Sequence, residues 1–290
     1  MNGIVIVDKP QDWTSQDVTA RLRRVFQTKR IGHGGTLDPM ATGVLPVFVG
    51  RATRGVEFFE HADKVYEATL RLGVLTDTED ITGTVLETRE VSVLKDDILG
   101  ILPQFTGEIQ QIPPMYSAIK VDGQKLYHLA REGKEVARQS RTITIFSLEL
   151  LGMEGQDVFL RVHCSKGTYI RTLCKDIGVA LGCGGCMAAL RRTAAGNYPE
   201  AEAIPLQTLI QESEAGADME QYLRPVDSLF ADRPKLTLTA NQERRCRNGN
   251  AFSHPAAPGQ YRVYSASGEF LMLGQIKDGM MTTVKSFFEV

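Results

Sequence analysis

Several features that would assign the chain to a special class are missing from its sequence. No run of residues is long and apolar enough to span a bilayer, and Met1–Pro10 lacks the basic segment, apolar stretch and cleavage site of a secretory signal. We therefore expect neither secretion nor membrane insertion, and we expect a cytoplasmic protein. Because 42% of the residues are hydrophobic and 23% are charged, as in average folded domains, the composition also argues against disorder.

The chain has few cysteines and a small net charge. The five cysteines are odd in number and scattered, which indicates reduced thiols rather than a disulfide framework. Cys183 and Cys186 have CxxC spacing, but no second pair follows at zinc spacing, so we expect no metal site and no redox function. The formal charge of −2 gives the chain no overall attraction for phosphate, and any nucleic-acid surface must come from local patches.

Hydrophobic periodicity predicts a mixture of helices and strands. Thr14 and Asp17 form a capping-box pattern at the start of an amphipathic helix that runs to about residue 26. Apolar and polar side chains alternate in Lys64–Leu72 and again in Val158–Cys164, as they do in half-buried strands. Another helix is predicted to begin near Ile170 and to end in a glycine-rich stretch.

The pattern changes beyond residue 231. A length of 290 residues allows a large domain with a small one attached. The elements expected in the second part are a short helix over Ala240–Arg247 and strands near Leu236–Thr239, Tyr261–Tyr264, Phe270–Ile276 and Met280–Phe287. We therefore predict a catalytic domain over residues 1–231 and a small, mostly β domain over residues 232–290.

Residues 113–141 are expected to leave the core of the larger domain. This segment contains a Pro-Pro pair, two glycines and more basic than acidic side chains, and long excursions of this kind are usually functional or mobile. The basic residues are Lys120, Lys125, Arg131, Lys134, Arg138 and Arg141. They make the excursion a candidate for gripping RNA.

The densest local signal is GHGGTLDPMATGVLP at residues 32–46. Its glycines make the backbone compliant, and Pro39 pushes Asp38 out of the helical region, so a carboxylate is presented on a loop. A phosphate loop is disfavoured because the third glycine and the Lys-Ser/Thr pair are both missing. By pattern alone, an Asp-Pro turn explains Asp38 better than catalysis does, Tyr66 is an ordinary core tyrosine, and His33 is a turn residue.

The same fifteen residues closely resemble the signature loop of the TruB family of tRNA pseudouridine synthases. The resemblance continues in order through KVYEATLRLG (64–73), TDTEDITG (76–83), PPMYSAIKVDGQKLYHLAREG (113–133), VHCSKGTYIRTLCKDIG (162–178) and LRRTAAG (190–196). It implies an α/β (α+β) catalytic domain built on a mixed, largely antiparallel sheet. The match of the C-terminal segment to a PUA-like RNA-binding domain is looser.

The resemblance also implies roles for individual residues. Asp38 stands at the position of the essential catalytic carboxylate, and Arg171 at that of the arginine that holds it. A cation near a helix start is unfavourable by about 0.3–1 kcal/mol unless an anion compensates, and Asp38 can be that anion. The other implied positions are His33 against the rearranged RNA loop, Tyr66 stacked on the flipped uracil, Tyr169 beside Arg171, Leu190 lining the base pocket, and Lys9-Pro10 supporting the loop.

By resemblance, the substrate is the uridine at position 55 in the TΨC arm of tRNA. The expected reaction exchanges a C–N for a C–C glycosidic bond in a flipped base, and it needs no cofactor, no metal and no obligate protein partner. We expect a monomer. Three alternatives stay open from the sequence: the catalytic subunit of a guide-RNA particle, a tRNA-binding folding chaperone without catalysis, and a nucleotide-binding enzyme that uses the glycine-rich loop.

Overall fold

The structure is a computed structural model that describes residues 1–117, 119–121 and 123–289 of the chain. Six basic residues were predicted for the excursion. The side chains of Lys120, Lys125 and Arg131 lie outside the described part, and those of Lys134, Arg138 and Arg141 lie within it. Within the described ranges, no helix combines the length and the apolar character needed to cross a membrane.

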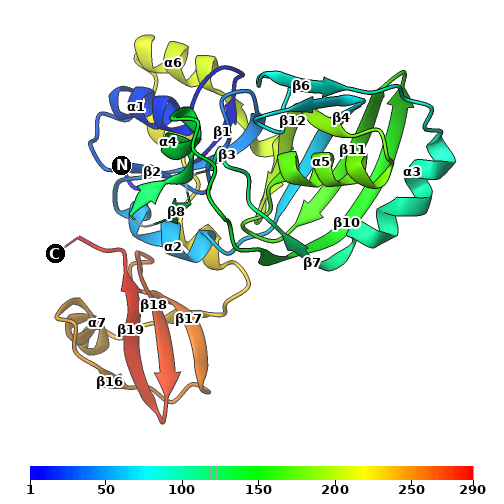
Figure 1. The fold of residues 1–290 in the computed structure, drawn as a ribbon. Helices are drawn as coiled ribbons and strands as arrows, with labels where there is room; N and C mark the ends of the chain where they lie inside the picture. The colour runs from blue at the N-terminus through cyan, green and yellow to red at the C-terminus, as the bar shows by residue number, and fades with distance from the viewer. Residues whose placement is uncertain (118, 122, 290) are drawn as a thin grey trace.

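A ten-stranded sheet forms the body of the molecule, in the order β14-β1-β3-β12-β4-β11-β10-β7, with β13 beside β12 and β2 beside β3 (Figure 1). The strands are β1 (Gly3–Lys9), β2 (Ile31–His33), β3 (Thr42–Val49), β4 (Lys64–Leu72), β7 (Gly107–Gln111), β10 (Arg141–Glu154), β11 (Asp157–Cys164), β12 (Gly185–Ala195), β13 (Tyr198–Pro199) and β14 (Ile204–Pro205). Neighbours are antiparallel except β1 with β14 and β3 with β12, which confirms the predicted mixed, largely antiparallel sheet.

Helices cover the sheet in two groups that share one hydrophobic core. Helices α1 (Ser15–Val25) and α6 (Leu206–Glu214) lie beside the β1 and β3 half, and α5 (Ile170–Ala180) and α3 (Lys95–Ile101) lie beside the other half (Figure 1). The predicted first helix is confirmed: Thr14 caps α1, and its side chain and that of Asp17 form the reciprocal hydrogen bonds of a capping box.

Strand β4 has the bounds that alternation predicted. Its burial alternates residue by residue, with Tyr66, Ala68, Leu70 and Leu72 inside and the residues between them half-exposed. Removing a leucine side chain of this kind from water stabilises the fold by roughly 1.5–3 kcal/mol. This strand therefore anchors the face on which Tyr66 lies.

The two halves of the sheet are joined where β3 meets β12. The register there pairs Thr42 with Arg191 and Gly43 with Arg192. Gly43 has φ +98°, and a Cβ atom on it would lie 2.3 Å from the Arg192 carbonyl oxygen. Only glycine fits both the backbone conformation and this close approach, because any side chain would push the two halves apart.

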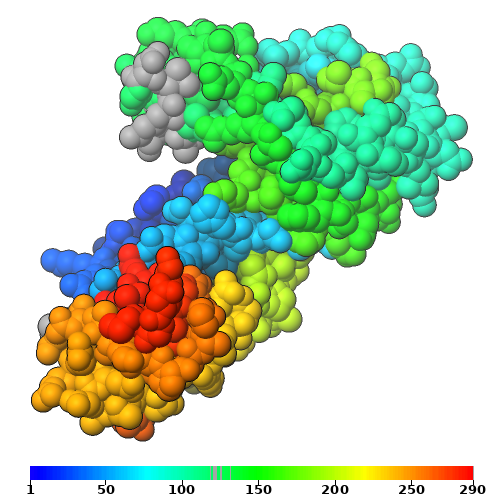
Figure 2. Space-filling view, turned by 90° about the horizontal axis from the view of Figure 1, so that it is seen from below, coloured from blue at the N-terminus to red at the C-terminus, as the bar shows by residue number. Residues whose placement is uncertain are grey.

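Residues 112–140 leave the sheet between β7 and β10, whose pairing ends at Gln111 and Arg141. The excursion contains β8 (Lys120–Val121), β9 (Gln124–Lys125) and α4 (Leu126–Arg131). The remaining short elements of this part of the chain are η1 (Gly50–Gly55), α2 (Val56–Phe59), β5 (Val74–Thr76), β6 (Val85–Thr88), η2 (Leu102–Phe105), η3 (Glu200–Glu202), η4 (Met219–Tyr222) and η5 (Val226–Phe230). Figure 2 shows the excursion, in green, standing over a hollow in the molecular surface.

The C-terminal part is a small β structure, as the sequence predicted. Its five strands run in the order β15-β17-β18-β19-β16. They are β15 (Lys235–Thr237), β16 (Phe252–Ser253), β17 (Gly259–Tyr264), β18 (Phe270–Lys277) and β19 (Met280–Ser286), with α7 (Ala240–Arg247) beside them. Phe270 and Phe287 stack at 5.4 Å between ring centroids and contact Phe230 of the preceding segment, so aromatic packing joins this sheet to the larger domain.

We predict that Gly43→Ala destabilises the fold more than Gly107→Ala does. Both glycines have positive φ, but a Cβ at Gly107 meets nothing within 4 Å. The overpacked Gly43→Ala should therefore lose about 1–3 kcal/mol more of the free energy of unfolding, measured by denaturant titration. Equal losses in the two variants would show that the junction of β3 with β12 tolerates a side chain.

Candidate active site

Asp38 and Arg171 form the centre of the site. Asp38 lies in the loop between β2 and β3, where its carbonyl oxygen accepts the Ala41 N–H at 3.0 Å in a turn. Arg171 is the second residue of α5. Its Nε lies 3.0 Å from Asp38 Oδ2, with 7% of the arginine side chain and 39% of the aspartate side chain exposed. A solvent-facing carboxylate is thus held by a buried cation.

The other nitrogens of Arg171 are held by two further segments. Nη1 donates to the Thr78 carbonyl at 3.1 Å, and Nη2 donates to the Tyr116 carbonyl at 2.9 Å. Asp80 Oδ2 lies 3.8 Å from Nη1. These contacts fix the plane of the guanidinium and leave Nε directed at Asp38. Sequence reasoning assigned no role to these acceptors, because a main-chain carbonyl has no residue signature, although both segments lie in the blocks that carry the resemblance.

Lys9 anchors the loop that carries Asp38. Its Nζ donates to the carbonyls of Pro10 at 2.8 Å, Trp13 at 2.6 Å and Pro39 at 3.1 Å, so it ties the residue next to Asp38 to the end of β1. The side chain is fully buried, and burial lowers the pKa of Lys9 to about 8. These bonds have the geometry for the loop support that the resemblance implied.

Arg192 is a third buried cation beside the loop. Its Nε donates to the Val44 carbonyl at 2.7 Å and its Nη2 to the Gly35 carbonyl at 3.1 Å. Tyr66 pairs with Arg192 across β4 and β12, and 8% of Tyr66 is exposed. Burial raises the pKa of Tyr66, so its phenol is protonated at neutral pH.

His33, Tyr169 and Leu190 lie around this centre. His33 ends β2, and burial, followed by the positive charge of Arg192, lowers its pKa, so its imidazole is neutral at pH 7. Tyr169 precedes α5, and the buried Gln111 side chain holds its backbone N–H at 2.8 Å and carbonyl at 3.0 Å. Leu190 is 9% exposed and lies opposite Ala68, on the face of the sheet that carries Tyr66. Gln111 was not singled out from the sequence.

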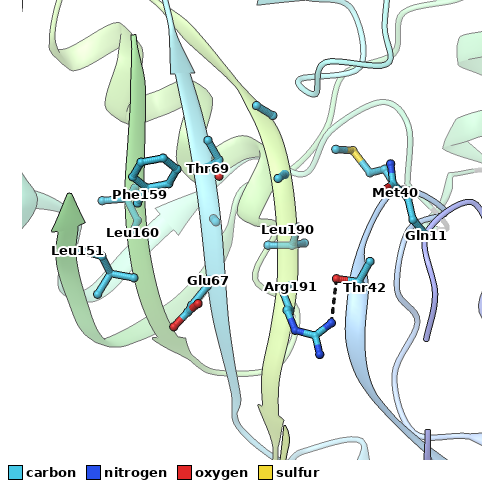
Figure 3. A pocket seen from close by; sticks show the side chains of 13 residues that line it. Gln11, Met40, Thr42, Glu67, Thr69, Leu151, Phe159, Leu160, Leu190 and Arg191 are labelled. Carbon is cyan, nitrogen blue, oxygen red and sulfur yellow. Dashed lines mark hydrogen bonds between the residues drawn. The ribbon is translucent and has the colours of Figure 1, made fainter. Parts of the chain in front are cut away.

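A cavity of about 520 Å³ lies where β12 and β4 approach the Asp38 loop. Figure 3 shows Leu190 of β12 and Met40 and Thr42 from the loop and β3 around it. Glu67 and Thr69 line it from the face of β4 opposite to Tyr66, whereas Ala68 and Leu190 belong to the face that carries Tyr66. Arg191 Nη1 donates to Thr42 Oγ1 at 3.2 Å and closes one side.

The five cysteines are free thiols, and all are buried. Burial raises the pKa of Cys186 to about 11, so it is a protonated thiol at neutral pH. Among the described residues, no group of three or more His, Cys, Asp and Glu side chains has the arrangement of a metal site.

Comparison with known proteins identifies the family of the chain. Residues 23–170 match the TruB family pseudouridylate synthase N-terminal domain, and residues 171–231 match the tRNA pseudouridylate synthase B C-terminal domain. The chain belongs to the TruB family. It is accordingly an isomerase that converts uridine to pseudouridine.

Curated relatives agree over nearly the full length. The chain is 45% identical over 282 residues to the tRNA pseudouridine synthase B of Ectopseudomonas mendocina, covering 96% of this chain and 92% of that protein. It is 41% identical over 293 residues to the enzyme of the same name from Clostridium kluyveri, covering 99% and 100%. The TruB resemblance read from the sequence motifs is thus confirmed.

Two solved structures share the fold of this chain. A crystal structure of a Cbf5-Nop10-Gar1 complex matches with a TM-score of 0.75 and 28% identity, covering 99% of this chain and 85% of that chain. A structure of an H/ACA RNP bound to a substrate RNA containing 2′-deoxyuridine matches with a TM-score of 0.74 and 26% identity, covering 99% and 85%. The fold class predicted for both domains is confirmed.

We predict that activity falls as the pH rises through about 8, because Lys9 then loses its charge. A neutral amine has two N–H donors for the three carbonyls that it now holds, so one contact to the loop is lost. The unfolded chain binds the proton up to about pH 10.5, so the contribution of Lys9 to stability rises with pH between about 8 and 10.5. The loss of activity should therefore appear without unfolding.

The measurement is the single-turnover rate from pH 6.5 to 9.5, with circular dichroism at each pH. Lys9→Arg is the control, because a guanidinium keeps its charge over this range. The comparison is between the shapes of the two pH profiles, since Lys9→Arg can also change the rate at every pH. Its profile should lack the step near pH 8, and an identical step in both proteins would assign the titration to another group.

Proposed function

We propose that the chain isomerises the uridine at position 55 in the T arm of tRNA, with Asp38 as the catalytic carboxylate. The observation that carries the proposal is the pair formed by the solvent-facing Asp38 and the buried Arg171, 3.0 Å apart. The curated relatives are named tRNA pseudouridine synthase B, which supports tRNA as the substrate. Position 55 is taken from the motif resemblance alone.

The reaction breaks the N1–C1′ bond of the nucleotide and forms a C5–C1′ bond after the uracil has turned. A carboxylate can assist in two ways: by adding to C1′ while N1 leaves, or by removing the C2′ proton in an elimination. Either route needs Asp38 ionised, exposed to the sugar and fixed in direction. In both routes the C5 proton is released to solvent after the new bond forms.

We infer that Tyr66 and Leu190 form the two sides of a base site. A uridine in a folded loop must be extruded before its glycosidic bond can be reached, at a cost of a few kcal/mol, and a tyrosine face can return about 1–3 kcal/mol of stacking. Tyr66 and Leu190 lie on the same sheet face, from neighbouring strands. In this proposal His33, with its neutral imidazole, packs against the displaced RNA loop, and Tyr169 borders the site at the start of α5.

Two surfaces are proposed to grip the rest of the tRNA. The excursion over residues 113–141 stands over the hollow seen in Figure 2 and reaches the site through the Tyr116 carbonyl. The domain over residues 232–290 packs against the larger domain through its aromatic cluster and would contact the RNA beyond the T loop. We further propose that the enzyme works as a cytoplasmic monomer without a cofactor.

The structural likeness to Cbf5 complexes raises the guide-RNA alternative. The identity to those chains is 28% and 26%, whereas the identity to the relatives named tRNA pseudouridine synthase B is 45% and 41% over nearly the whole chain. The tRNA pseudouridine synthases B are therefore the nearer model for substrate choice. A chain that acts alone on a tRNA transcript would exclude a requirement for a guide RNA.

The test is tritium release from an unmodified tRNA transcript labelled at C5 of uridine, followed by mapping of the modified nucleotide. We expect stoichiometric release by the native chain at position 55 and a loss of at least about 10³-fold in Asp38→Asn, because the amide can neither ionise nor attack. Asp96→Asn, which changes an exposed aspartate in the first turn of α3, is the matched control and should keep its activity.

Tight tRNA binding without release by the native chain would overturn the proposed function and leave a binding protein or a guide-dependent subunit. Release that maps to another uridine would keep the chemistry and change the substrate. Retained activity in Asp38→Asn would remove the catalytic role from this residue.

A further inference from the structure

Glu79 is an acid with a left-handed backbone conformation in the loop between β5 and β6. Its φ is +64°, and 8% of the residue is exposed. A glutamate adopts this conformation rarely, and such residues persist only where the surrounding structure fixes them. The contacts of its side chain and of its neighbours show what fixes it here.

The carboxylate of Glu79 is bound to α5. Oε2 accepts the Thr172 hydroxyl at 2.6 Å, and Oε1 accepts the Lys175 ammonium at 2.7 Å. Helix α5 has no acidic residue in its own first turn, although Arg171 lies there. Glu79 therefore supplies, from another segment, the negative charge that a helix start favours.

The residues on either side of Glu79 contact Arg171. Thr78 provides the carbonyl that accepts Nη1 at 3.1 Å, and the Asp80 carboxylate lies 3.8 Å from the same nitrogen. The main chain of the loop is also tied to β12, because Met187 N–H donates to the Glu79 carbonyl at 3.0 Å and Ile81 N–H donates to the Met187 carbonyl at 2.9 Å. The loop is held on α5 by the Glu79 and Asp80 carboxylates and the Thr78 carbonyl, and on β12 by its backbone.

We propose that Glu79 is a positioning residue for the Arg171 guanidinium, and through it for Asp38. Thr172 follows Arg171 directly in α5, so the Glu79 carboxylate and the Thr78 carbonyl clamp adjacent residues of one helical turn. Losing the side-chain clamp frees a strained loop to relax, and the Thr78 carbonyl moves with it. This inference rests on the proposed role of Asp38, and it adds a residue outside the site that the sequence motifs assigned.

The experiment compares Glu79→Ala, Glu79→Gly and Glu79→Gln in single-turnover release of tritium, with the enzyme at saturating concentration and in excess over tRNA. We expect Glu79→Ala and Glu79→Gly to lower the rate by about 10- to 100-fold, as small misplacements of catalytic groups do, with the tRNA Kd changed by less than about twofold. Glu79→Gln keeps an oxygen acceptor for Thr172 and should lose less than about tenfold.

Glycine separates the backbone from the side chain. It adopts positive φ freely but cannot bind Thr172 or Lys175, so full activity in Glu79→Gly would overturn the proposal. Glu87→Ala is the matched control: Glu87 is an exposed acid in β6 whose ion pair is with Arg89, and its loss should leave the rate unchanged. Thermal unfolding of each variant shows whether it is folded at the assay temperature.

A double-mutant cycle with Arg171→Lys tests whether the effect passes through the arginine. If it does, Glu79→Ala should cost less than about threefold in the Arg171→Lys background, because the geometry that it protects is already lost. The full 10- to 100-fold loss in that background would overturn the proposal. Rates are compared at whichever uridine the native chain modifies. A wrong assignment of position 55 would appear in the mapping of the native product, and a wrong role for Asp38 would appear as retained activity in Asp38→Asn. Both are therefore distinguished from a failure of the Glu79 proposal.

Discussion

The burial of the Arg171 guanidinium is the constraint on which the site depends. An ion taken out of water loses several kcal/mol of solvation unless its hydrogen bonds are replaced. Here the replacements come from the Asp38 loop, from the loop that carries Thr78 and Asp80, and from Tyr116 at the base of the excursion. Three segments far apart in the sequence must therefore be in place before the arginine can be buried, and the burial of one cation sets the position of all three.

The same principle recurs twice around the loop. Lys9 and Arg192 are both fully buried, and both donate to main-chain carbonyls: Lys9 to those of Pro10, Trp13 and Pro39, and Arg192 to those of Val44 and Gly35. A carbonyl neutralises less charge than a carboxylate does, so positive potential remains near Asp38. That potential suits both an ionised carboxylate and the phosphates of an RNA substrate.

The sequence predicted the elements whose signals are local. The capping box of α1, the alternation of β4 and the short helix α7 each depend on residues a few positions apart, and each prediction matched the structure. The pairing of Asp38 with Arg171, 133 positions apart, was predicted only through family resemblance and the electrostatic argument that a cation at a helix start needs an anion.

What could not be predicted depends on the main chain or on three-dimensional register. The carbonyls of Thr78 and Tyr116 accept from Arg171 whatever their side chains are, so no residue type marks them. The need for glycine at position 43 follows from its approach to Arg192, which exists only once β3 and β12 are paired. Nothing in the sequence singled out Glu79, because its role depends on a positive φ and on two contacts with α5 that appear only in the folded structure.

The Tyr116 carbonyl gives the excursion a direct effect on the chemistry. A hydrogen bond to a charged group contributes about 1.5–3 kcal/mol, so an excursion displaced from the site would leave one guanidinium nitrogen unsatisfied at that cost. Gln111, at the base of the excursion, holds the backbone of Tyr169 just before Arg171, so the same segment reaches the start of α5 twice. The chain on both sides of residue 112 is thus connected to the start of α5, through Gln111 on one side and Tyr116 on the other.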